Sequence, residues 1–157
     1  PMLGLIRLAP LMSRALSSSS GNAFRAVLCE KLSPPPPFTK DSFAVRSLPY
    51  MKPGEGEVLI QVKAAAVNFP DILIVQGKYQ FKPEPPFSPG SEIAGVVLEC
   101  GEGVQGVKPN DKVLGSIPWG GYAELACVPS NRLMPVPPGM GFAEASSLLM
   151  AYGTAYH

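Results

Sequence analysis

The fold is decided by residues 57–71, which read Glu57-Val-Leu-Ile-Gln-Val-Lys-Ala-Ala-Ala-Val-Asn-Phe-Pro-Asp71. Apolar and polar residues alternate over residues 57–64, with Leu59 as the exception, and this period of two predicts a half-buried strand. Asn68 followed three residues later by Asp71 is typical of a helix N-terminus. The stretch therefore predicts a strand that leads directly into a short helix.

Six more short strands are expected around this centre, each bounded by proline or glycine. The chain has 19 prolines and 16 glycines among 157 residues, which leaves little room for long helices. A second helix is expected over residues 142–151. The fold class that follows is mainly β, a barrel or sandwich with a few short helices. The other expected strands are residues 24–29, 43–48, 92–99, 112–117, 122–128 and 132–136.

A dinucleotide-binding pattern occurs at residues 101–106, Gly101-Glu-Gly103-Val-Gln-Gly106. Phosphate binding by such glycines requires a helix that begins directly after them, because the helix N–H groups hold the pyrophosphate. Here a turn at residues 107–111 follows, and then another expected strand. We therefore interpret the glycines as a hairpin turn.

The composition excludes several classes of protein. Lys and Arg number 13 and Asp and Glu number 12, so the net charge of +1 offers no basic surface for nucleic acid. No apolar run reaches 18 residues, so no membrane span is expected. Apolar residues make up 46%, which is ordinary for a globular domain. The three cysteines form no CxxC pair.

The first 22 residues differ from the rest of the chain. They contain Arg7 and Arg14, are rich in serine, and no acid occurs before Glu30. This is the composition of a mitochondrial presequence. We expect residues 1–22 to direct the protein to the mitochondrial matrix; a tail without a targeting role is the alternative.

Four motifs follow one another along the chain: Ala64-Ala-Ala-Val-Asn68-Phe-Pro-Asp71, Pro89-Gly90-Ser91-Glu92-Ile-Ala-Gly95, Lys108-Pro-Asn-Asp111-Lys-Val113 and Gly120-Gly-Tyr-Ala-Glu124. In this order they resemble the N-terminal, GroES-like domain of the medium-chain dehydrogenase/reductase superfamily. The resemblance is greatest to its zinc-free quinone oxidoreductases, the zeta-crystallin group, and it extends over residues 24–157. It implies a partly open, GroES-like β-barrel over residues 23–140, with residues 141–157 starting a helix toward a Rossmann domain absent from this chain.

The same resemblance bears on zinc. Where the alcohol dehydrogenase relatives place a cysteine and a histidine, this chain has Asn68 and Ser91, and only the neighbouring Glu92 is retained. His157 is the only histidine. Since zinc requires three or four N, S or O ligands, no metal is expected.

Without zinc, the resemblance implies hydride transfer from NADPH to a quinone or enone. It points to Tyr79 as the proton donor, with a rim tyrosine as the alternative. Asn68 would donate to the substrate oxygen and contact the cofactor, or serve as a helix N-cap, or both. Asp71 is a catalytic candidate or a helix-start acid. Thr154 would lie near the cofactor, or is an ordinary helix residue.

The sequence therefore predicts the substrate-side domain of a zinc-independent, NADPH-dependent quinone or enone oxidoreductase. We expect the chain alone to be inactive, because no residue in it could fix the pyrophosphate. A full-length form is expected to be a homodimer. An enoyl thioester reductase is an alternative, and a non-catalytic GroES-like interaction module or inactive remnant is another. If the final helix is cut short, Leu148, Leu149 and Met150 should be exposed.

Overall fold

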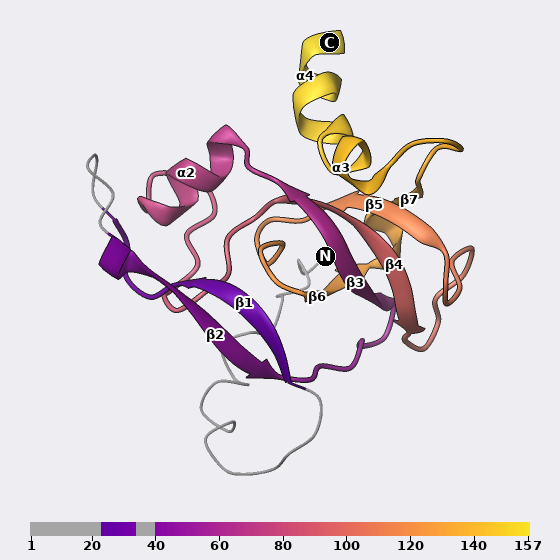
Figure 1. Ribbon diagram of the computed structural model, residues 1–157, viewed down its shortest axis with the longest axis horizontal. Helices are drawn as coiled ribbons and strands as arrows, with labels where there is room; N and C mark the ends of the chain where they lie inside the picture. The colour runs from indigo at the N-terminus through magenta and orange to yellow at the C-terminus, as the bar shows by residue number, and fades with distance from the viewer. Residues whose placement is uncertain (1–22, 34–39) are drawn as a thin grey trace.

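The computed structural model describes residues 23–33 and 40–157, so the predicted presequence at residues 1–22 lies outside it. Two antiparallel sheets form the body of the molecule (Figure 1). The first pairs β1 (Ala23–Cys29) with β2 (Phe43–Pro49). The second has the order β6-β3-β4-β5-β7. Its strands are β3 (Glu57–Ala66), β4 (Glu92–Cys100), β5 (Lys112–Ser116), β6 (Leu125–Pro129) and β7 (Leu133–Pro135).

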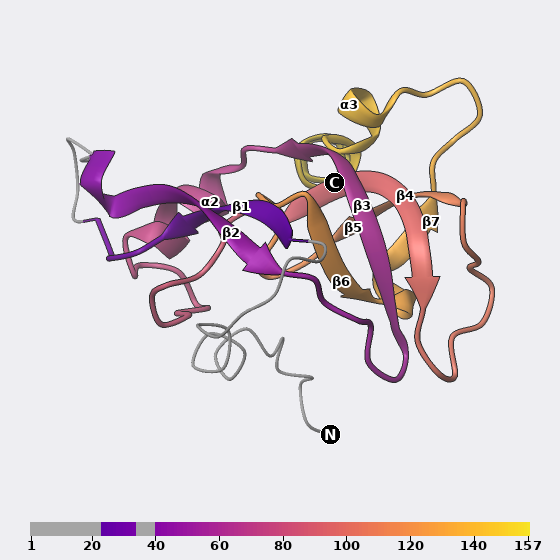
Figure 2. The same cartoon turned by 60° about the horizontal axis from the view of Figure 1, so that its bottom comes forward.

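The prediction of a mainly β fold with a few short helices is confirmed, and the two sheets are open instead of closing into a barrel. Register shifts in the β3–β4 pairing at Leu59/Ile60 and Val62/Ala64 bend the larger sheet, as β-bulges do. Figure 2 shows that β3 and β4 are themselves curved, with the β1–β2 pair beside the five-stranded sheet.

β3 is buried on both faces only near its start, which explains why Leu59 breaks the alternation there. Val58 and Ile60 belong to the core inside the five-stranded sheet. Leu59 points the other way, into a second cluster with Phe24 and Leu28 of β1. Where both faces are covered, neither needs to be polar, and over residues 61–64 exposed and half-buried residues alternate as expected.

The strand expected over residues 122–128 begins only at Leu125, and the reason lies in its hydrogen bonds. Ala123 makes an isolated bridge to Ala26 of β1. The Tyr122 backbone N–H donates to the carbonyl of Pro89, 2.9 Å away. The first two residues of this stretch therefore bond to β1 and to the segment before β4. Glu124, the third, bonds to both sides, because its N–H donates to Arg25 of β1 and its carbonyl accepts from Val62 of β3.

The glycines at residues 101–106 lie in the loop between β4 and β5, which pair antiparallel. The interpretation as a hairpin connection is confirmed, since no helix follows these glycines before β5. In the part of the chain that the structure covers, no helix has both the length and the apolar character needed to cross a membrane.

The first helix forms where expected, as α2 (Phe69–Val75), and packs Ile74 and Val75 against Cys29 and Phe87. The single helix expected over residues 142–151 is wrong, because the segment is divided. It consists of α3 (Phe142–Ala145), the π-helical η3 (Leu148–Tyr152) and α4 (Gly153–Tyr156). Single 3₁₀ turns, η1 (Lys40–Ser42) and η2 (Ser130–Arg132), complete the described elements.

Two serines mark the division between α3 and η3. The Ser146 hydroxyl donates to the Ala143 carbonyl at 2.9 Å, and the Ser147 hydroxyl donates to the Glu144 carbonyl at 3.0 Å. Serine hydroxyls that bond the preceding turn in this way compete with helical hydrogen bonds and bend a helix. From Leu148 on, η3 and α4 run without interruption, and we call residues 148–156 the C-terminal helical segment.

The expectation that Leu148, Leu149 and Met150 are exposed is also wrong. All three are half-buried, and the two leucines pack against the cluster of Ala94, Leu114 and Ala145. Exposure begins directly beyond them, at Ala151.

Gly95 offers a test of how closely β3 and β4 approach. A Cβ at Gly95 would overlap the carbonyl oxygen of Gln61 and the side chain of Ile60 on β3. We expect Gly95→Ala to lower the free energy of unfolding by about 1–3 kcal/mol, the usual cost of overpacking. The measurement is urea denaturation.

Gly153→Ala is the matched control, because a Cβ there meets nothing closer than 4.0 Å and the position is helical. It should leave the stability unchanged or raise it by up to about 1 kcal/mol. Equal decreases in the free energy of unfolding in the two variants would contradict the close approach of β3 and β4.

Candidate active site

The candidate residues gather at one end of the five-stranded sheet. The last residue of β3, Ala66, pairs with the first residue of β4, Glu92, which also pairs with Ser116 at the end of β5. α2 begins three residues after β3 ends, with Asn68 as its N-cap. Figure 1 shows α2 at the upper left, above the β1–β2 pair, and the C-terminal helical segment at the top, above the five-stranded sheet.

Glu92 is completely buried at this end of the sheet, with 0% of its surface exposed. Its Oε2 accepts a hydrogen bond from Nδ2 of Asn68 at 3.0 Å. Its Oε1 accepts from the backbone N–H groups of Leu149, at 2.6 Å, and Met150, at 3.1 Å. Three donors thus compensate the loss of water around one carboxylate.

Asp71 forms the second half of the arrangement. Its Oδ2 accepts from the Asn68 backbone N–H, 2.8 Å away, which is the bond expected of a helix-start acid. The Tyr122 hydroxyl donates to the same oxygen at 2.8 Å and also lies 3.2 Å from the carbonyl of Ala66. Asn68 therefore links two carboxylates, and Asp71 links it in turn to Tyr122. We call Asn68, Asp71, Glu92 and Tyr122 the Asn68 cluster.

Tyr122 is held in its neutral form by this environment. Burial raises the pKa of its hydroxyl well above the ordinary value, and the hydrogen bond to Asp71 raises it further. A neutral hydroxyl can donate to Asp71, whereas a phenolate beside that carboxylate would meet like charge. Tyr122 is thus a donor already committed to Asp71.

Two buried oxygens of this region have no hydrogen-bond partner among the described residues, Asp71 Oδ1 and Ser91 Oγ. Asp71 is 3% exposed and Ser91 is 5% exposed. They belong to two of the motifs that carry the resemblance to the GroES-like domain. Each oxygen is therefore able to accept a further hydrogen bond.

Tyr79 lies apart from these bonds, in the loop after α2. It packs half-buried against the cluster of Cys29, Ile74, Val75 and Phe87. Its ring makes an edge contact with Phe81 at a centroid distance of 5.8 Å, and Phe81 lies 6.3 Å from Trp119. No residue in the described ranges hydrogen-bonds the Tyr79 hydroxyl, which leaves it free to act on a ligand.

Thr154 is exposed, in α4, the last turn of the C-terminal helical segment. No hydrogen bond is found between Thr154 and the Asn68 cluster in the described part of the chain. The segment that carries Thr154 is, however, hydrogen-bonded to Glu92 through the backbone N–H groups of Leu149 and Met150. Glu92 thus links this segment to Asn68.

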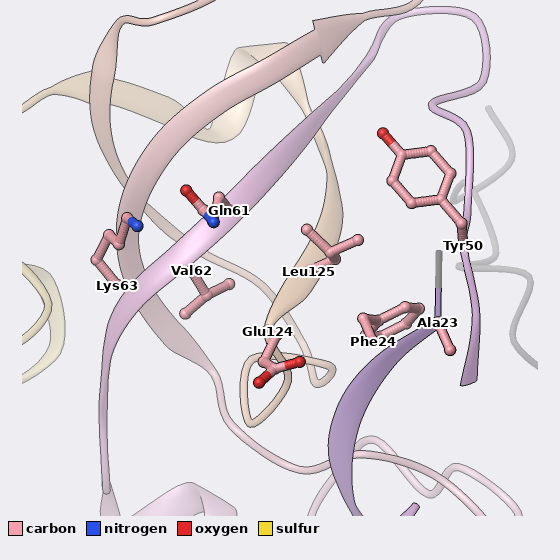
Figure 3. A pocket seen from close by; sticks show the side chains of 8 residues that line it. All are labelled: Ala23, Phe24, Tyr50, Gln61, Val62, Lys63, Glu124 and Leu125. Atoms are coloured by element: carbon pink, nitrogen blue, oxygen red, sulfur yellow. The ribbon is translucent and has the colours of Figure 1, made fainter. Parts of the chain in front are cut away.

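A surface hollow of about 500 Å³ lies elsewhere, beside β1 and β3 (Figure 3). Its wall includes Glu124, whose carboxylate receives the Arg25 guanidinium at 2.6 Å. None of the candidate residues Asn68, Asp71, Tyr79 or Thr154 lines it. The candidate site therefore does not coincide with this hollow.

The sequence reasoning did not place Glu92 or Tyr122 among the site residues. A signal was available for Glu92, since an acid opens the otherwise apolar stretch of residues 92–98 and requires a partner when buried. No comparable signal marked Tyr122, which was expected to be an ordinary strand residue. Its role depends on a contact with Asp71, 51 positions away.

Asn68 and Glu92, which the resemblance sets at and beside the zinc-ligand positions of the alcohol dehydrogenase relatives, do not fit a metal ion. Both Glu92 oxygens are occupied by N–H donors, and Asn68 turns its N–H group, a donor, toward them. Within residues 23–33 and 40–157, no three His, Cys, Asp or Glu side chains come together as a metal site would require.

Comparison with known proteins identifies relatives of the chain. Residues 54–138, more than half of the chain, match the model of the alcohol dehydrogenase GroES-like domain. The "Quinone oxidoreductase-like protein 2 homolog" of Nematostella vectensis is 40% identical over 135 residues, which are 85% of this chain and 35% of that protein. The chain thus spans about a third of the length of this relative.

Solved structures agree with the expected GroES-like fold. A probable oxidoreductase from Mycobacterium abscessus has a TM-score of 0.77 and 39% identity, over 86% of this chain and 42% of that one. The quinone oxidoreductase from Thermus thermophilus, solved also in complex with NADPH, has a TM-score of 0.68 and 32% identity. That match covers 84% of this chain and 39% of the other.

The raised pKa of Tyr122 predicts a pH dependence of stability. Folding favours the protonated hydroxyl, so its contribution is complete below the ordinary tyrosine pKa of about 10 and is lost as the pH rises above it. Tyr122→Phe should lower the free energy of unfolding at pH 7 by about 1–3 kcal/mol, because Asp71 loses a buried donor. Between about pH 10 and pH 11.5 the difference from the unaltered protein should narrow.

Urea denaturation across this pH range measures the effect. Tyr152→Phe is the control, because Tyr152 is 67% exposed on the C-terminal helical segment. If the loss of unfolding free energy in Tyr122→Phe stays constant throughout that pH range, the Tyr122 hydroxyl does not hold its proton more tightly in the folded state than in the unfolded state.

Proposed function

The chain belongs to the alcohol dehydrogenase GroES-like domain family, and on that basis we propose that it is the substrate-side domain of a zinc-independent, NADPH-dependent quinone or enone oxidoreductase. The name of the Nematostella relative and the NADPH complex of the Thermus enzyme support the substrate and the cofactor. Because the chain spans only 35% of the first of these, the activity proposed is that of a longer protein containing this domain.

The observation that carries the proposal is the amide of Asn68. The resemblance sets it where the alcohol dehydrogenase relatives have a zinc ligand, and Glu92 holds it through one N–H of Nδ2. An amide nitrogen carries two hydrogens, so a second N–H remains for a ligand. A fixed N–H donor can stabilise negative charge that develops on a carbonyl oxygen, as a metal ion does in other enzymes.

The proposed reaction uses this donor and a proton source. Bound NADPH, which Asn68 and Thr154 would contact, would supply the hydride for the conjugated carbon, and the electron pair displaced there would collect on the carbonyl oxygen. The Asn68 N–H stabilises the charge on that oxygen, and the Tyr79 hydroxyl donates a proton to it. Tyr79 suits this role better than Tyr122, because the Tyr122 hydroxyl is already bound to Asp71.

Asp71 and Thr154 have supporting roles in this proposal. Asp71 holds the backbone N–H of Asn68 and thereby fixes the start of α2, so we assign it to positioning. Thr154 is exposed on the C-terminal helical segment, where it is available to a cofactor. We further propose that the longer protein is a homodimer and acts in the mitochondrial matrix. An enoyl thioester presents the same conjugated carbonyl and remains the alternative substrate.

A non-catalytic interaction module is the second candidate for the chain by itself. Its support is the loop at residues 101–106, where glycines precede a strand and no helix N–H groups are available to a pyrophosphate. The two candidate functions differ in their need for a cofactor. An oxidoreductase domain requires a dinucleotide site beyond the described residues, whereas an interaction module requires no such site.

Titration of the 157-residue chain with NADPH tests this division. We expect no saturable heat of binding in calorimetry at millimolar NADPH, since Asn68 and Thr154 would contact the cofactor without holding its phosphates. A dissociation constant in the micromolar range would contradict our account of where the cofactor is bound.

Tyr79→Phe tests the reaction, in a two-domain protein that contains this chain. It should lower kcat for NADPH-dependent quinone reduction by roughly 10²–10⁴, the effect of losing a general acid. Tyr50→Phe is the control, because the Tyr50 hydroxyl donates to Glu99 at 2.5 Å and takes no part in the Asn68 cluster. Equal kcat values for Tyr79→Phe and the unaltered protein would remove Tyr79 from the mechanism.

A further inference from the structure

Glu92 connects two segments that are distant in the sequence and that the proposed reaction uses together. It opens β4, where its backbone is fixed by pairing with Ala66 on one side and Ser116 on the other. Its side chain reaches Asn68, 24 residues earlier, and the N–H groups of Leu149 and Met150, 57 and 58 residues later. The carboxylate therefore stands at a junction of three elements.

The chemistry of a carboxylate determines how Asn68 is oriented. An ionised carboxylate accepts hydrogen bonds and donates none. Asn68 must therefore turn Nδ2 toward Glu92, because Oδ1 in that position would face another acceptor. Both Glu92 oxygens are engaged, Oε2 by Asn68 and Oε1 by the two backbone N–H groups, so the carboxylate cannot rotate without breaking a bond.

The same carboxylate fixes the beginning of the C-terminal helical segment. The first N–H groups of a helical segment have no partner within it, and negative charge at that end is favourable. Glu92 Oε1 takes up two of these groups, at Leu149 and Met150, while Leu148 and Leu149 pack into the core below. Thr154 lies at the end of this anchored segment.

We infer that Glu92 is a positioning residue that fixes the rotation of the Asn68 amide and, through Leu149 and Met150, the placement of the segment that carries Thr154. It thus sets the relative position of the two residues assigned to the cofactor and substrate. The importance of that position rests on the proposed function. The hydrogen-bond junction itself exists in the chain without cofactor or substrate and can be tested there.

Glu92→Gln is the decisive variant, because glutamine has the same shape but replaces one acceptor by a donor. If its oxygen stays with Leu149 and Met150, its NH₂ group faces the NH₂ group of Asn68, and Asn68 must turn its oxygen inward. In NMR spectra of the ¹⁵N-labelled 157-residue chain, the Asn68 side-chain amide signals should shift and lose their protection from exchange. Exchange at the Leu149 and Met150 amides should accelerate by about tenfold, since charge-assisted bonds are the stronger ones.

A double-mutant cycle with Asn68→Asp gives a readout that a merely structural role would not change. Asn68→Asp alone places two carboxylates in contact and should destabilise the fold. Adding Glu92→Gln should then restore a donor–acceptor pair of reversed direction and raise the equilibrium constant for folding at least tenfold. In the unaltered background the same Glu92→Gln substitution should lower that constant. The effect of Glu92→Gln thus changes sign with residue 68.

Glu57→Gln is the matched control, because Glu57 also accepts a backbone N–H, from Gly54 at 3.0 Å, but does not contact Asn68. It should have the same effect in both backgrounds. Unshifted Asn68 signals in Glu92→Gln, or equal effects of Glu92→Gln in both backgrounds, would overturn the inference. Should Glu92→Gln alone not fold, a folded double variant supports the inference and an unfolded one contradicts it.

The outcome is independent of the proposed activity, because neither NADPH nor quinone is present in these measurements. If the Glu92 variants behave as expected but the longer protein has no quinone reductase activity, the positioning role of Glu92 is supported and the proposed function is contradicted. If the longer protein is active but Glu92→Gln leaves the Asn68 signals unchanged, the proposed function is supported and the positioning role is contradicted.

Discussion

The structure depends on one electrostatic requirement, that the buried carboxylate of Glu92 be fully hydrogen-bonded. A carboxylate withdrawn from water costs several kcal/mol unless donors replace the solvent. Here the donors come from the start of α2 and from the start of the C-terminal helical segment. To satisfy Glu92, the chain must bring both segments to the same end of the five-stranded sheet. The arrangement of the candidate site follows from that requirement.

The chemistry available at this end of the sheet follows in turn. The carboxylate and the amide of Asn68 satisfy each other, which leaves no free oxygen on Glu92 and one unassigned N–H on Asn68. A metal ion would need a free carboxylate oxygen on Glu92, which is lacking. A carbonyl oxygen of a ligand needs an N–H donor, which Asn68 provides. Asp71 and Tyr122 reinforce the backbone of Asn68 from the other side. An amide held so firmly can stabilise developing charge without reorganising.

Much of the fold could be predicted from the sequence because its signals are local. Alternation marked β3, and the spacing of Asn68 and Asp71 marked the start of α2. The glycines at residues 101–106 could be excluded as a phosphate site from the sequence, because a turn follows them instead of a helix. The division of the last helix was missed, because it depends on the hydroxyls of two serines, residues that occur in helices as well as at their ends.

The candidate site could be predicted less completely, because the bonds of Glu92 and Tyr122 join residues 24 to 58 positions apart. Asn68 and Asp71 could be recognised from the sequence because they lie at the start of a helix. Glu92 and Tyr122, which orient them, could not, because their positions next to Asn68 and Asp71 depend on how the strands pair. We propose that this oriented amide takes the place of a metal ion. Metal analysis of an active two-domain protein tests it most directly: we predict quinone reduction with far less than one zinc ion per subunit. Stoichiometric zinc whose removal abolishes turnover would contradict the account.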